Sequence, residues 1–382
     1  MTNRERMFKT FNHENADRIP SAIHARGEVQ RALAEYYGVL SYREVLRLLG
    51  ADTYGRLIFD AAFPGFKDKT TAVLRGDCPG AGNRYIFHDT RTFEDGWGVI
   101  RRVGRDGKYV EWVTGPLAEA GDPDEYAGWS ELEKFSMQTL YEGEQDFCDS
   151  TELSAFFNRI KSEDLVVQVV TTQPYKTAWL LRGMENVLAD YLINRPFLEK
   201  LYDRIFHIAG EILRRCTQAG ADIIGFDGDI AMQDRVIMGP ESWRAVDKPR
   251  LAELLASCKA INPDVVTFIH SDGDVSEILP DLIEVGFEVI DPIQPECMDP
   301  AEVKRLYGEQ ITLHGCGSLQ RTLPFGSPAD CRQEVIHLIE RCGRGGGLVL
   351  RVSNNMDDNI PMENIASWYE TARDYVPSYL KG

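Results

Sequence analysis

Short apolar runs alternate with amphipathic stretches along most of the chain. Eight runs rich in β-branched and apolar residues each end in polar or glycine residues, as a buried strand does where it leads into a loop. They are residues 18–23, 53–60, 165–172, 222–227, 265–270, 289–294, 311–315 and 348–353. From the third run onward helical patterns separate them, at residues 184–219, 239–261, 275–285, 300–307, 328–342 and 361–375. Apolar strands that alternate with amphipathic helices predict a parallel sheet covered by helices.

The regular spacing of the strands in the second half favours closure into a (β/α)8 TIM barrel over an open, doubly wound sheet.

One region breaks the alternation of strands and helices. Between about residues 80 and 115, short alternating runs joined by an Asp106-Gly107 turn predict an antiparallel hairpin. We interpret it as an insertion in a βα loop, positioned to line or cover a pocket. The chain has no low-complexity tract, linker or short repeat, so we expect residues 1–382 to form a single barrel domain.

Composition narrows the possible partners. The chain has 60 acidic and 42 basic residues, a net charge of −18, whereas nucleic-acid binding needs clustered Lys and Arg. The longest uncharged stretch, residues 165–175, is about half as long as a membrane span requires. The charged N-terminus is unlike a signal peptide, and the eight cysteines contain no C-x-x-C pair, which indicates reduced thiols. We therefore expect a cytoplasmic protein without a nucleic-acid or membrane partner.

Side chains that can titrate, donate or bind metal come directly after seven of the eight predicted strands. Catalytic groups of a (β/α)8 barrel lie on the strand ends and loops of one face, so these side chains predict a shared pocket. The candidate pocket residues are, in chain order, His24, Arg26, Asp229, His270, Asp272, Gln294, Glu296, Asn354 and Asn355.

His270 and Asp272 are the most specific candidates. Two residues apart in an extended segment, their side chains share one face, which suits a shared ligand. The alternative is that His270 is a hydrogen-bonded core residue. Asp229 is as compatible with a turn as with a pocket carboxylate, and we expect Asp274 to cap the following helix.

Motifs spread over nearly the whole chain resemble the uroporphyrinogen decarboxylase superfamily. They are Asn12-His-Glu-Asn-Ala-Asp17-Arg18-Ile-Pro20, Asp227-Gly-Asp229-Ile-Ala-Met-Gln233, Pro240-Glu-Ser-Trp243, Lys248-Pro-Arg250, His270-Ser-Asp-Gly-Asp274, Asp291-Pro-Ile-Gln294-Pro-Glu296, Leu323-Pro-Phe-Gly-Ser-Pro328, Ser353-Asn-Asn-Met356 and Ile360-Pro-Met-Glu-Asn-Ile365. The resemblance implies a barrel enzyme of one of two kinds, so the choice between them depends on the site.

The first kind comprises cofactor-free decarboxylases that hold a substrate with eight carboxylates. The resemblance assigns part of that task to an N-terminal Arg-Gln-Ala-Gly-Arg segment, which corresponds here to His24-Ala-Arg26-Gly-Glu28. One arginine is missing and a glutamate lies nearby, although carboxylates are best bound by paired guanidinium groups. This disfavours a porphyrinogen substrate. A decarboxylase acting on a less charged substrate remains one alternative, and a non-catalytic binding barrel is a second.

The second kind comprises methyltransferases that move a methyl group between a corrinoid protein and a small molecule. Their coenzyme M members bind zinc with a His-x-Cys pair after the fifth strand and a Cys after the eighth. The resemblance places His270, Asp272 and Asn354 at these positions, so neither cysteine is retained. Harder ligands favour chemistry other than thiol activation.

We therefore predict the methyltransferase component of a corrinoid-dependent system, acting on a methyl ether or methylamine type of substrate. The direction of methyl transfer stays open, and cobalamin is expected on a partner protein. His270, Asp272 and Asp229 are predicted to bind zinc or another divalent metal, or to act as acid and base. The residues predicted to contact the substrate are His24, Arg26, Gln294, Glu296, Asn354 and Asn355.

Overall fold

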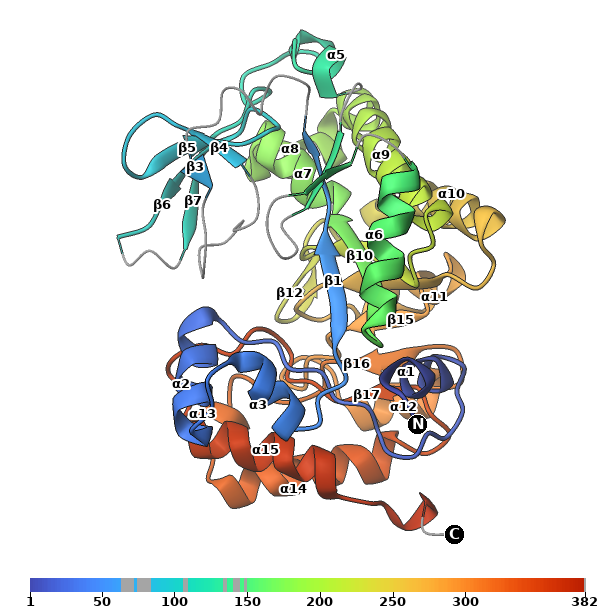
Figure 1. Cartoon of the computed structure of the whole chain (residues 1–382). Coiled ribbons are helices and arrows are strands. Elements are labelled where there is room, and N and C mark those ends of the chain that lie inside the picture. The colour runs from blue at the N-terminus through green and yellow to red at the C-terminus, as the bar shows by residue number, and fades with distance from the viewer. Residues whose placement is uncertain are drawn as a thin grey trace.

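The computed structural model describes residues 1–62, 72–73, 84–105, 109–132, 136–139, 145–147 and 150–380. Its main sheet has seven parallel strands, and their order in space follows their order in the chain (Figure 1). The strands are β1 (Tyr54–Ile58), β10 (Val166–Thr172), β11 (Ile223–Asp227), β14 (Val266–His270), β15 (Val289–Asp291), β16 (Thr312–His314) and β17 (Leu348–Val349). All seven lie within predicted runs, because a continuous apolar segment suits a parallel sheet whose two faces are both covered.

The first predicted strand, residues 18–23, is a short segment at Ser21 and Ala22. It takes the eighth strand position of the barrel, between β17 and β1. The Ala22 N–H donates to the Leu350 carbonyl (2.8 Å), and the Asp52 N–H donates to the Ser21 carbonyl (2.6 Å). The segment is shorter than the predicted strand of residues 18–23, because its pairing with the last strand is limited to isolated bridges. These bonds connect the two edges of the sheet, as the predicted (β/α)8 barrel requires.

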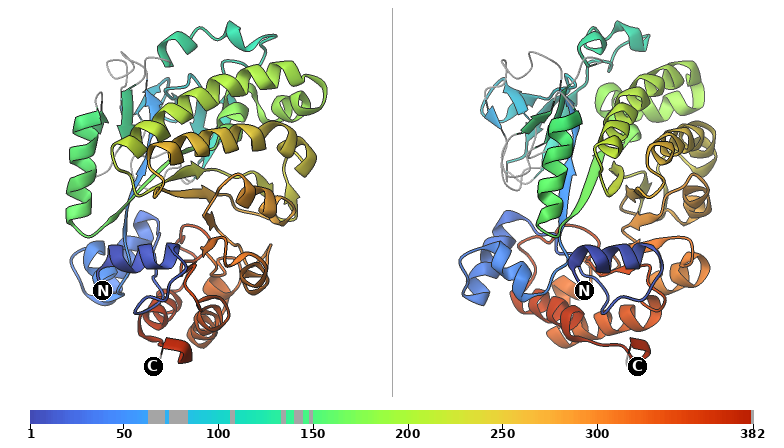
Figure 2. Two further views of the ribbon diagram at one scale, coloured as in Figure 1. Left: turned by 90° about the vertical axis from the view of Figure 1, so that its right-hand side faces the viewer. Right: turned by 45° about the vertical axis from the view of Figure 1, so that its right-hand side comes forward.

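Helices surround the sheet on its outer side (Figure 2). They include α2 (Gly27–Tyr37), α3 (Tyr42–Leu48), α6 (Ser150–Ser162), α7 (Pro174–Arg182), α8 (Met184–Ile193), α9 (Arg195–Gln218), α10 (Pro240–Ile261), α11 (Leu279–Glu284), α12 (Pro300–Tyr307), α13 (Thr322–Phe325), α14 (Pro328–Cys342) and α15 (Met362–Asp374). The single helix predicted for residues 184–219 is two helices, since Asn194 leaves the helical conformation (φ −137°). Pro196 then lies in the first turn of α9, where its missing N–H has no partner to lose.

The barrel interior is apolar at its N-terminal end and polar at its C-terminal end. Alternate side chains of a strand point the same way, so Phe268 and His270 both face inward. Phe268 packs with Met7 and Phe11 of α1 (Asn3–Phe11), which plugs the N-terminal opening. Toward the C-terminal ends of the strands, the inward-facing side chains are charged or polar. They are Arg56, Asp227, His270, Asp291, His314 and Arg351.

Two antiparallel sheets are inserted between β1 and β10 (Figure 1). One contains β3 (Ala72–Val73), β4 (Arg84–Phe87), β5 (Thr92–Glu94), β6 (Ile100–Val103) and β7 (Val110–Thr114), and the other contains β2 (Asp60–Ala62), β8 (Ser136–Thr139) and β9 (Gln145–Phe147). The predicted hairpin is confirmed as β6 and β7, and its Asp106-Gly107 turn lies outside the described residues. The insertion extends beyond the predicted boundaries because β2, β3, β8 and β9 also belong to it.

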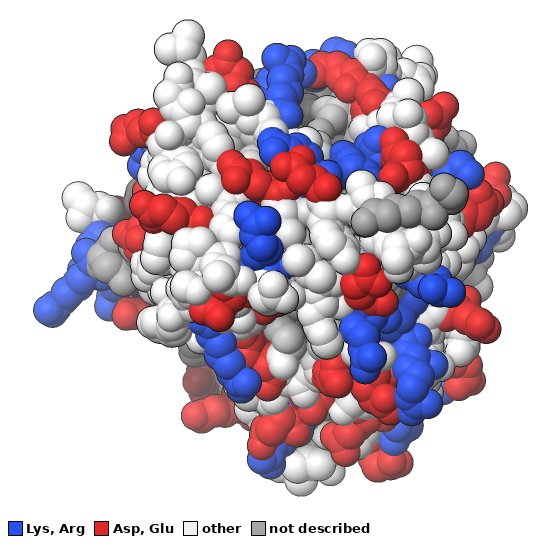
Figure 3. Space-filling view, turned by 90° about the horizontal axis from the view of Figure 1, so that it is seen from below, with Lys and Arg blue, Asp and Glu red and all other residues white. Residues whose placement is uncertain are grey.

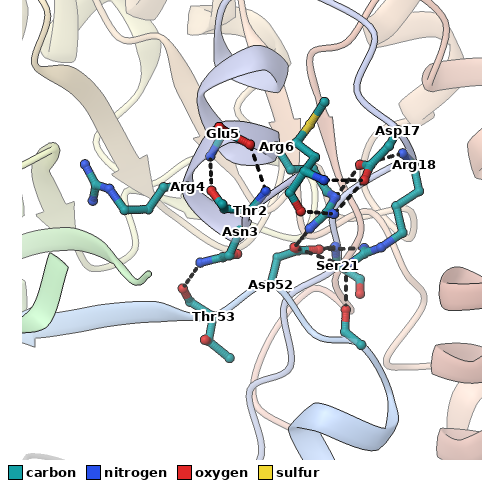
Figure 4. Close-up of polar contacts among 12 residues, drawn as sticks. Thr2, Asn3, Arg4, Glu5, Arg6, Asp17, Arg18, Ser21, Asp52 and Thr53 are labelled. Atoms are coloured by element: carbon teal, nitrogen blue, oxygen red, sulfur yellow. Dashed lines mark hydrogen bonds and ion pairs between the residues drawn. The ribbon is translucent and has the colours of Figure 1, made fainter. Parts of the chain in front are cut away.

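The N-terminal end of the barrel is held by ion pairs around Asp52, whose side chain is 1% exposed (Figure 4). Arg6 and Arg18 each place an Nη1 atom 2.6 Å from this carboxylate, and the Ser21 N–H donates to it at 3.0 Å. Arg6 also contacts Asp17 at 2.6 Å. The N-terminal motif that carries the family resemblance therefore stabilises the end of the barrel opposite to the predicted pocket.

The surface carries charges of both signs. On the face seen from below, Lys and Arg side chains are interspersed with Asp and Glu (Figure 3). Across the portion of the chain that the structure describes, none of the helices combines the length and the apolar character that crossing a membrane demands.

Candidate active site

The structure brings three predicted residues together at the C-terminal end of the barrel. His270 is the last residue of β14, Asp272 follows it in the loop, and Asp229 follows β11. One ligand atom from each of the three lies within 4.8 Å of the other two. The neighbouring positions of β11 and β14 in the sheet explain this, because Asp227 pairs with His270 in register.

The imidazole of His270 is held from one side. Its Nδ1–H donates to Oδ2 of Asp291 (2.7 Å), while Nε2 lies 3.8 Å from Oδ1 of Asp272. Burial by itself lowers the pKa of this imidazole. The hydrogen bond to Asp291, together with the nearby charges of Asp227, Asp291 and Asp272, outweighs burial and raises the pKa to about 9. At neutral pH His270 can therefore give a proton to a neighbouring group.

The two oxygens of the Asp272 carboxylate differ in their hydrogen bonding. Nδ2 of Asn354 donates to Oδ2 (2.5 Å), and the backbone N–H of Asp272 donates to Oδ1 of Asp229 (3.0 Å). The other oxygen, Oδ1, is buried and has no hydrogen-bond partner among the described residues. Burial and the charge of Asp229 raise the pKa of Asp272, against the opposing effect of His270. Such a buried oxygen without a partner destabilises the fold unless a ligand uses it.

These atoms fit a divalent metal. Nε2 of His270 lies 3.8 Å from Oδ1 of Asp272, and Asp229 brings a carboxylate to the same cluster, in which one ligand atom of each residue lies within 4.8 Å of the others. A nitrogen with two carboxylates and free coordination positions is a usual set for a catalytic metal. The orphaned Oδ1 of Asp272 is the observation that supports this fit most directly.

The other predicted residues of this rim hold loops in place. The amide oxygen of Gln294 accepts the Gly273 N–H (3.0 Å) and thereby fixes the loop after β14. Glu296 accepts the Ser318 hydroxyl (2.5 Å) and the Gln320 N–H (3.2 Å), which fixes the loop after β16. Asn355 is exposed beside Asn354, its backbone N–H bonded to the Asn354 side chain (2.6 Å).

His24 and Arg26 lie at the seam between the first and last strands. Burial and the positive charges of Arg351 and Arg56 lower the pKa of His24 well below its usual value, so the imidazole is neutral. The Arg26 guanidinium lies 3.7 Å from Asp357 and 5.7 Å from the ring centre of Tyr109. Because Tyr109 immediately precedes β7, the inserted sheet reaches the rim of the barrel there.

A cavity of about 410 Å³ opens beside this seam. Its walls come from the first strand segment, from α3 and from the residues that lead into β1 and β10. Ala22, His24 and Tyr54 line it on the barrel side. His270 and Asp272 do not line it, so this cavity is not the space around the candidate catalytic group.

The polar interior layer was not predicted from the sequence. Asp291, His314 and Arg351 form one hydrogen-bonded group, and Arg56 of β1 forms an ion pair with Asp227 of β11, on the far side of β10. Asp291 and Arg351 lie inside the predicted runs 289–294 and 348–353, whereas the sequence candidates are the last residues of the runs and the residues after them. Alternation within the strands could have placed these residues in the barrel interior, because side chains two positions apart, such as Val289 and Asp291, face the same side of a strand.

Comparisons with known proteins are consistent with this architecture. A methyltransferase structure from Methanosarcina mazei superposes with a TM-score of 0.65, at 18% identity, over 98% of this chain and 99% of that chain. The methylcobamide:CoM methyltransferase MtaA of Methanosarcina barkeri is 27% identical over 231 residues, which are 57% of this chain and 65% of that protein. A uroporphyrinogen decarboxylase of Nostoc punctiforme is 22% identical over 210 residues, 55% of each protein.

The chain thus spans at most 65% of the length of these two relatives. Residues 155–375, more than half of the chain, match the uroporphyrinogen decarboxylase (URO-D) family over the strands from β10 to β17 and the helices between them. The resemblance recognised in the sequence motifs is confirmed. The chain belongs to the uroporphyrinogen decarboxylase (URO-D) family.

Proposed function

We propose that the protein is the methyltransferase component of a corrinoid-dependent system. It moves a methyl group between a small methylated substrate, of the methyl ether or methylamine type, and a cobalamin-carrying protein. The observation that carries the proposal is the cluster of His270, Asp272 and Asp229, with its unused ligand atoms at the barrel mouth. The similarity to the methylcobamide:CoM methyltransferase MtaA supports the same reaction class.

The ligand set supports a substrate other than a thiol. Thiolate activation by zinc relies on soft sulfur ligands, whereas this cluster offers one imidazole and two carboxylates. Asn354 uses its side-chain N–H group on Asp272, so its role here is to orient that carboxylate. Oxygen-rich sets suit the polarisation of an ether or amine substrate.

The departing atom of a methyl ether becomes an alkoxide or phenolate unless it receives a proton. In the protein without a metal, His270 has a pKa of about 9 and can supply that proton from Nε2, and Asp272 can accept one because its pKa is raised. The methyl carbon exchanges its bond to oxygen for a bond to the acceptor, and the proton from His270 ends on the departing oxygen.

The alternative role of the same three residues is to hold a divalent metal, and Nε2 of His270 would then bind the ion and carry no proton. His270, Asp272 and Asp229 would hold the ion, and zinc is one candidate. When bound, the ion supplies Lewis-acid polarisation of the substrate heteroatom, while the protein residues orient the substrate and exclude water.

The proposed reaction also implies the partners of the protein. The corrinoid protein docks over the C-terminal end of the barrel, and His24, Arg26 and Asn355 contact the substrate beneath it. Gln294, Glu296 and Asn354 position the substrate indirectly, because they hold the loops and the Asp272 carboxylate in place. The inserted sheet, which reaches the rim through Tyr109 and Arg26, narrows this opening. We also propose that residues 1–382 act as a single domain and that the protein works in the cytoplasm without nucleic acid.

One observation favours a second candidate, a decarboxylase acting on a substrate with few carboxylates. Arg56 faces the barrel interior, and its Nε atom is buried without a partner among the described residues. A guanidinium with an unused N–H suits a carboxylate. The similarity to a uroporphyrinogen decarboxylase of Nostoc punctiforme is compatible with this alternative.

Reconstitution separates the two candidates. The purified protein is mixed with a corrinoid protein in the reduced cobalt(I) state and with methyl ether or methylamine substrates, and methyl-cobalt formation is followed by visible absorption. We expect formation of the methyl-cobalt species that requires His270. Turnover of uroporphyrinogen or of another carboxylic acid without any corrinoid protein would instead establish the decarboxylase.

A further inference from the structure

Asp291 is the centre of the polar interior layer. Its side chain is 1% exposed, and it receives donors from three other strand ends. Nδ1 of His270 (2.7 Å) and Nη1 of Arg351 (3.1 Å) donate to Oδ2, and Nδ1 of His314 (2.6 Å) donates to Oδ1. Both oxygens are therefore engaged by groups that lie well away from bulk water.

The donors around Asp291 are themselves held in place. Arg351 donates to the carbonyls of Val352 and Ser353, each at 2.9 Å. His314 keeps its second nitrogen, Nε2, 3.3 Å from the hydroxyl of Tyr54. Rotation of the Asp291 carboxylate would break bonds on both oxygens, so its orientation is set by the barrel and not by the substrate.

This orientation determines which nitrogen of His270 is available. A carboxylate that accepts the Nδ1–H group keeps the neutral ring in the Nδ1-protonated tautomer and directs Nε2 outward. In the structure Nε2 is the ring atom that lies toward Asp272. Asp291 makes no hydrogen bond to Asp272 or Asp229 that the structure shows, and its hydrogen-bonded contact with this cluster is the bond to Nδ1 of His270.

We propose that Asp291 is the positioning residue for His270, fixing its tautomer and ring plane so that Nε2 faces Asp272 and Asp229. The assignment deepens the proposed function, on which its consequence for catalysis rests. The positioning itself is a property of the free protein and is measured without methyl transfer.

The matched control is Asp222, a buried carboxylate at the opposite end of the barrel. It receives Arg4 through two bonds (2.5 and 3.0 Å), Lys161 (3.0 Å) and the Val167 N–H (2.8 Å). Asp222→Asn therefore perturbs a buried ion pair of similar kind without touching His270. Its cationic partners are each about a quarter exposed and remain hydrated, which allows the variant to fold.

The experiment compares the full-length protein with Asp291→Asn and Asp222→Asn. Two-bond ¹H–¹⁵N correlations at about pH 10, above the pKa of His270, identify the protonated ring nitrogen, and His270→Gln assigns the signal. We expect the Nδ1–H form in the wild type and in Asp222→Asn, and a mixture of tautomers in Asp291→Asn. Competition with a chelator should show Zn²⁺ affinity about 10–100-fold weaker in Asp291→Asn than in either of the others.

Two results would overturn the inference. One is a wild-type His270 whose neutral ring carries its proton on Nε2, which decides the question even if Asp291→Asn does not fold. The other is a folded Asp291→Asn protein with an unchanged tautomer. Failure of Zn²⁺ to bind the wild type, with the Nδ1–H form present, leaves the positioning role in place and counts against the metal part of the proposed function.

Discussion

The two ends of the barrel both contain buried carboxylates, but they use them differently. At the N-terminal end, Arg6, Arg18 and the Ser21 N–H occupy both oxygens of Asp52. At the C-terminal end, Oδ1 of Asp272 stays without a partner among the described residues, and Nε2 of His270 lies 3.8 Å away. A carboxylate with all its lone pairs engaged stabilises the fold, whereas a carboxylate and an imidazole with unused capacity can bind a ligand.

The polar layer inside the barrel supports the side chains of the candidate site above it. Asp291 is as buried as Asp52 and as fully engaged, yet it lies directly beneath the rim. Its bonds to Arg351 and His314 belong to the rigid part of the barrel, and its bond to His270 belongs to the site. The site thus lies on a layer of polar side chains in which the hydrogen bonds of Asp291 are satisfied. This layer holds His270 in position, while Oδ1 of Asp272 has no partner among the described residues.

The comparison predicts its largest effect at His270. His270→Ala should lower methyl transfer about 10²–10⁴-fold, because it removes the proton donor of the metal-free site or, with a metal bound, one of the metal ligands. The free energy of unfolding should fall by no more than about 1–2 kcal/mol, since Asp291 keeps Arg351 and His314 as partners. Activity assays and urea unfolding check both parts. If the variant fails to fold, His270 is a core residue and the division between the two ends is wrong.

Asp52→Ala should give the reverse result. Arg6 would lose one of its two carboxylate partners and Arg18 its carboxylate, and removing one member of a buried ion pair costs about 3–5 kcal/mol. Urea unfolding should show this loss, while methyl transfer per folded molecule stays unchanged at low temperature. A loss of activity in the folded fraction would mean that the N-terminal end also controls the site.

Metal content sharpens the comparison at the rim. Protein purified without chelator should contain about one equivalent of divalent metal, because three possible ligand atoms lie within 4.8 Å of one another. Elemental analysis should show that His270→Ala and Asp272→Ala both lose it. Substoichiometric metal that persists in His270→Ala would identify the cluster as an acid–base site without a metal.

The smallest expected effect is a dependence of stability on pH. The pKa of His270 is raised from 6.5 to about 9 in the fold, so folding favours the protonated ring. The resulting stabilisation is complete below pH 6.5 and is lost as the pH rises through 9. Unfolding of metal-free protein should therefore show a free energy that falls over this interval more steeply in the wild type than in His270→Gln. Equal slopes would show that His270 is not a charged partner of Asp291.

The pattern of neighbouring residues was sufficient to predict most strands and helices of the barrel and part of the candidate site. The strands were predictable because apolar runs and helical periodicity are properties of neighbouring residues, and α12 and α14 have the predicted boundaries. His270 and Asp272 were predictable as a pair because a two-residue spacing determines that their side chains share a face. Asp229 was predictable only as a candidate, since its approach to them depends on the register between β11 and β14.

Only the tertiary structure decided what engages each carboxylate. Asp291 meets His314 and Arg351 across 23 and 60 positions of the chain, and Arg6 meets Asp52 across 46. Such pairs depend on strand register and on closure of the sheet, which no short window of sequence contains. The sequence by itself determined which residues were available at each strand end. Burial and long-range pairing then decided that Asp52 is saturated and structural, and that Asp272 retains a free oxygen.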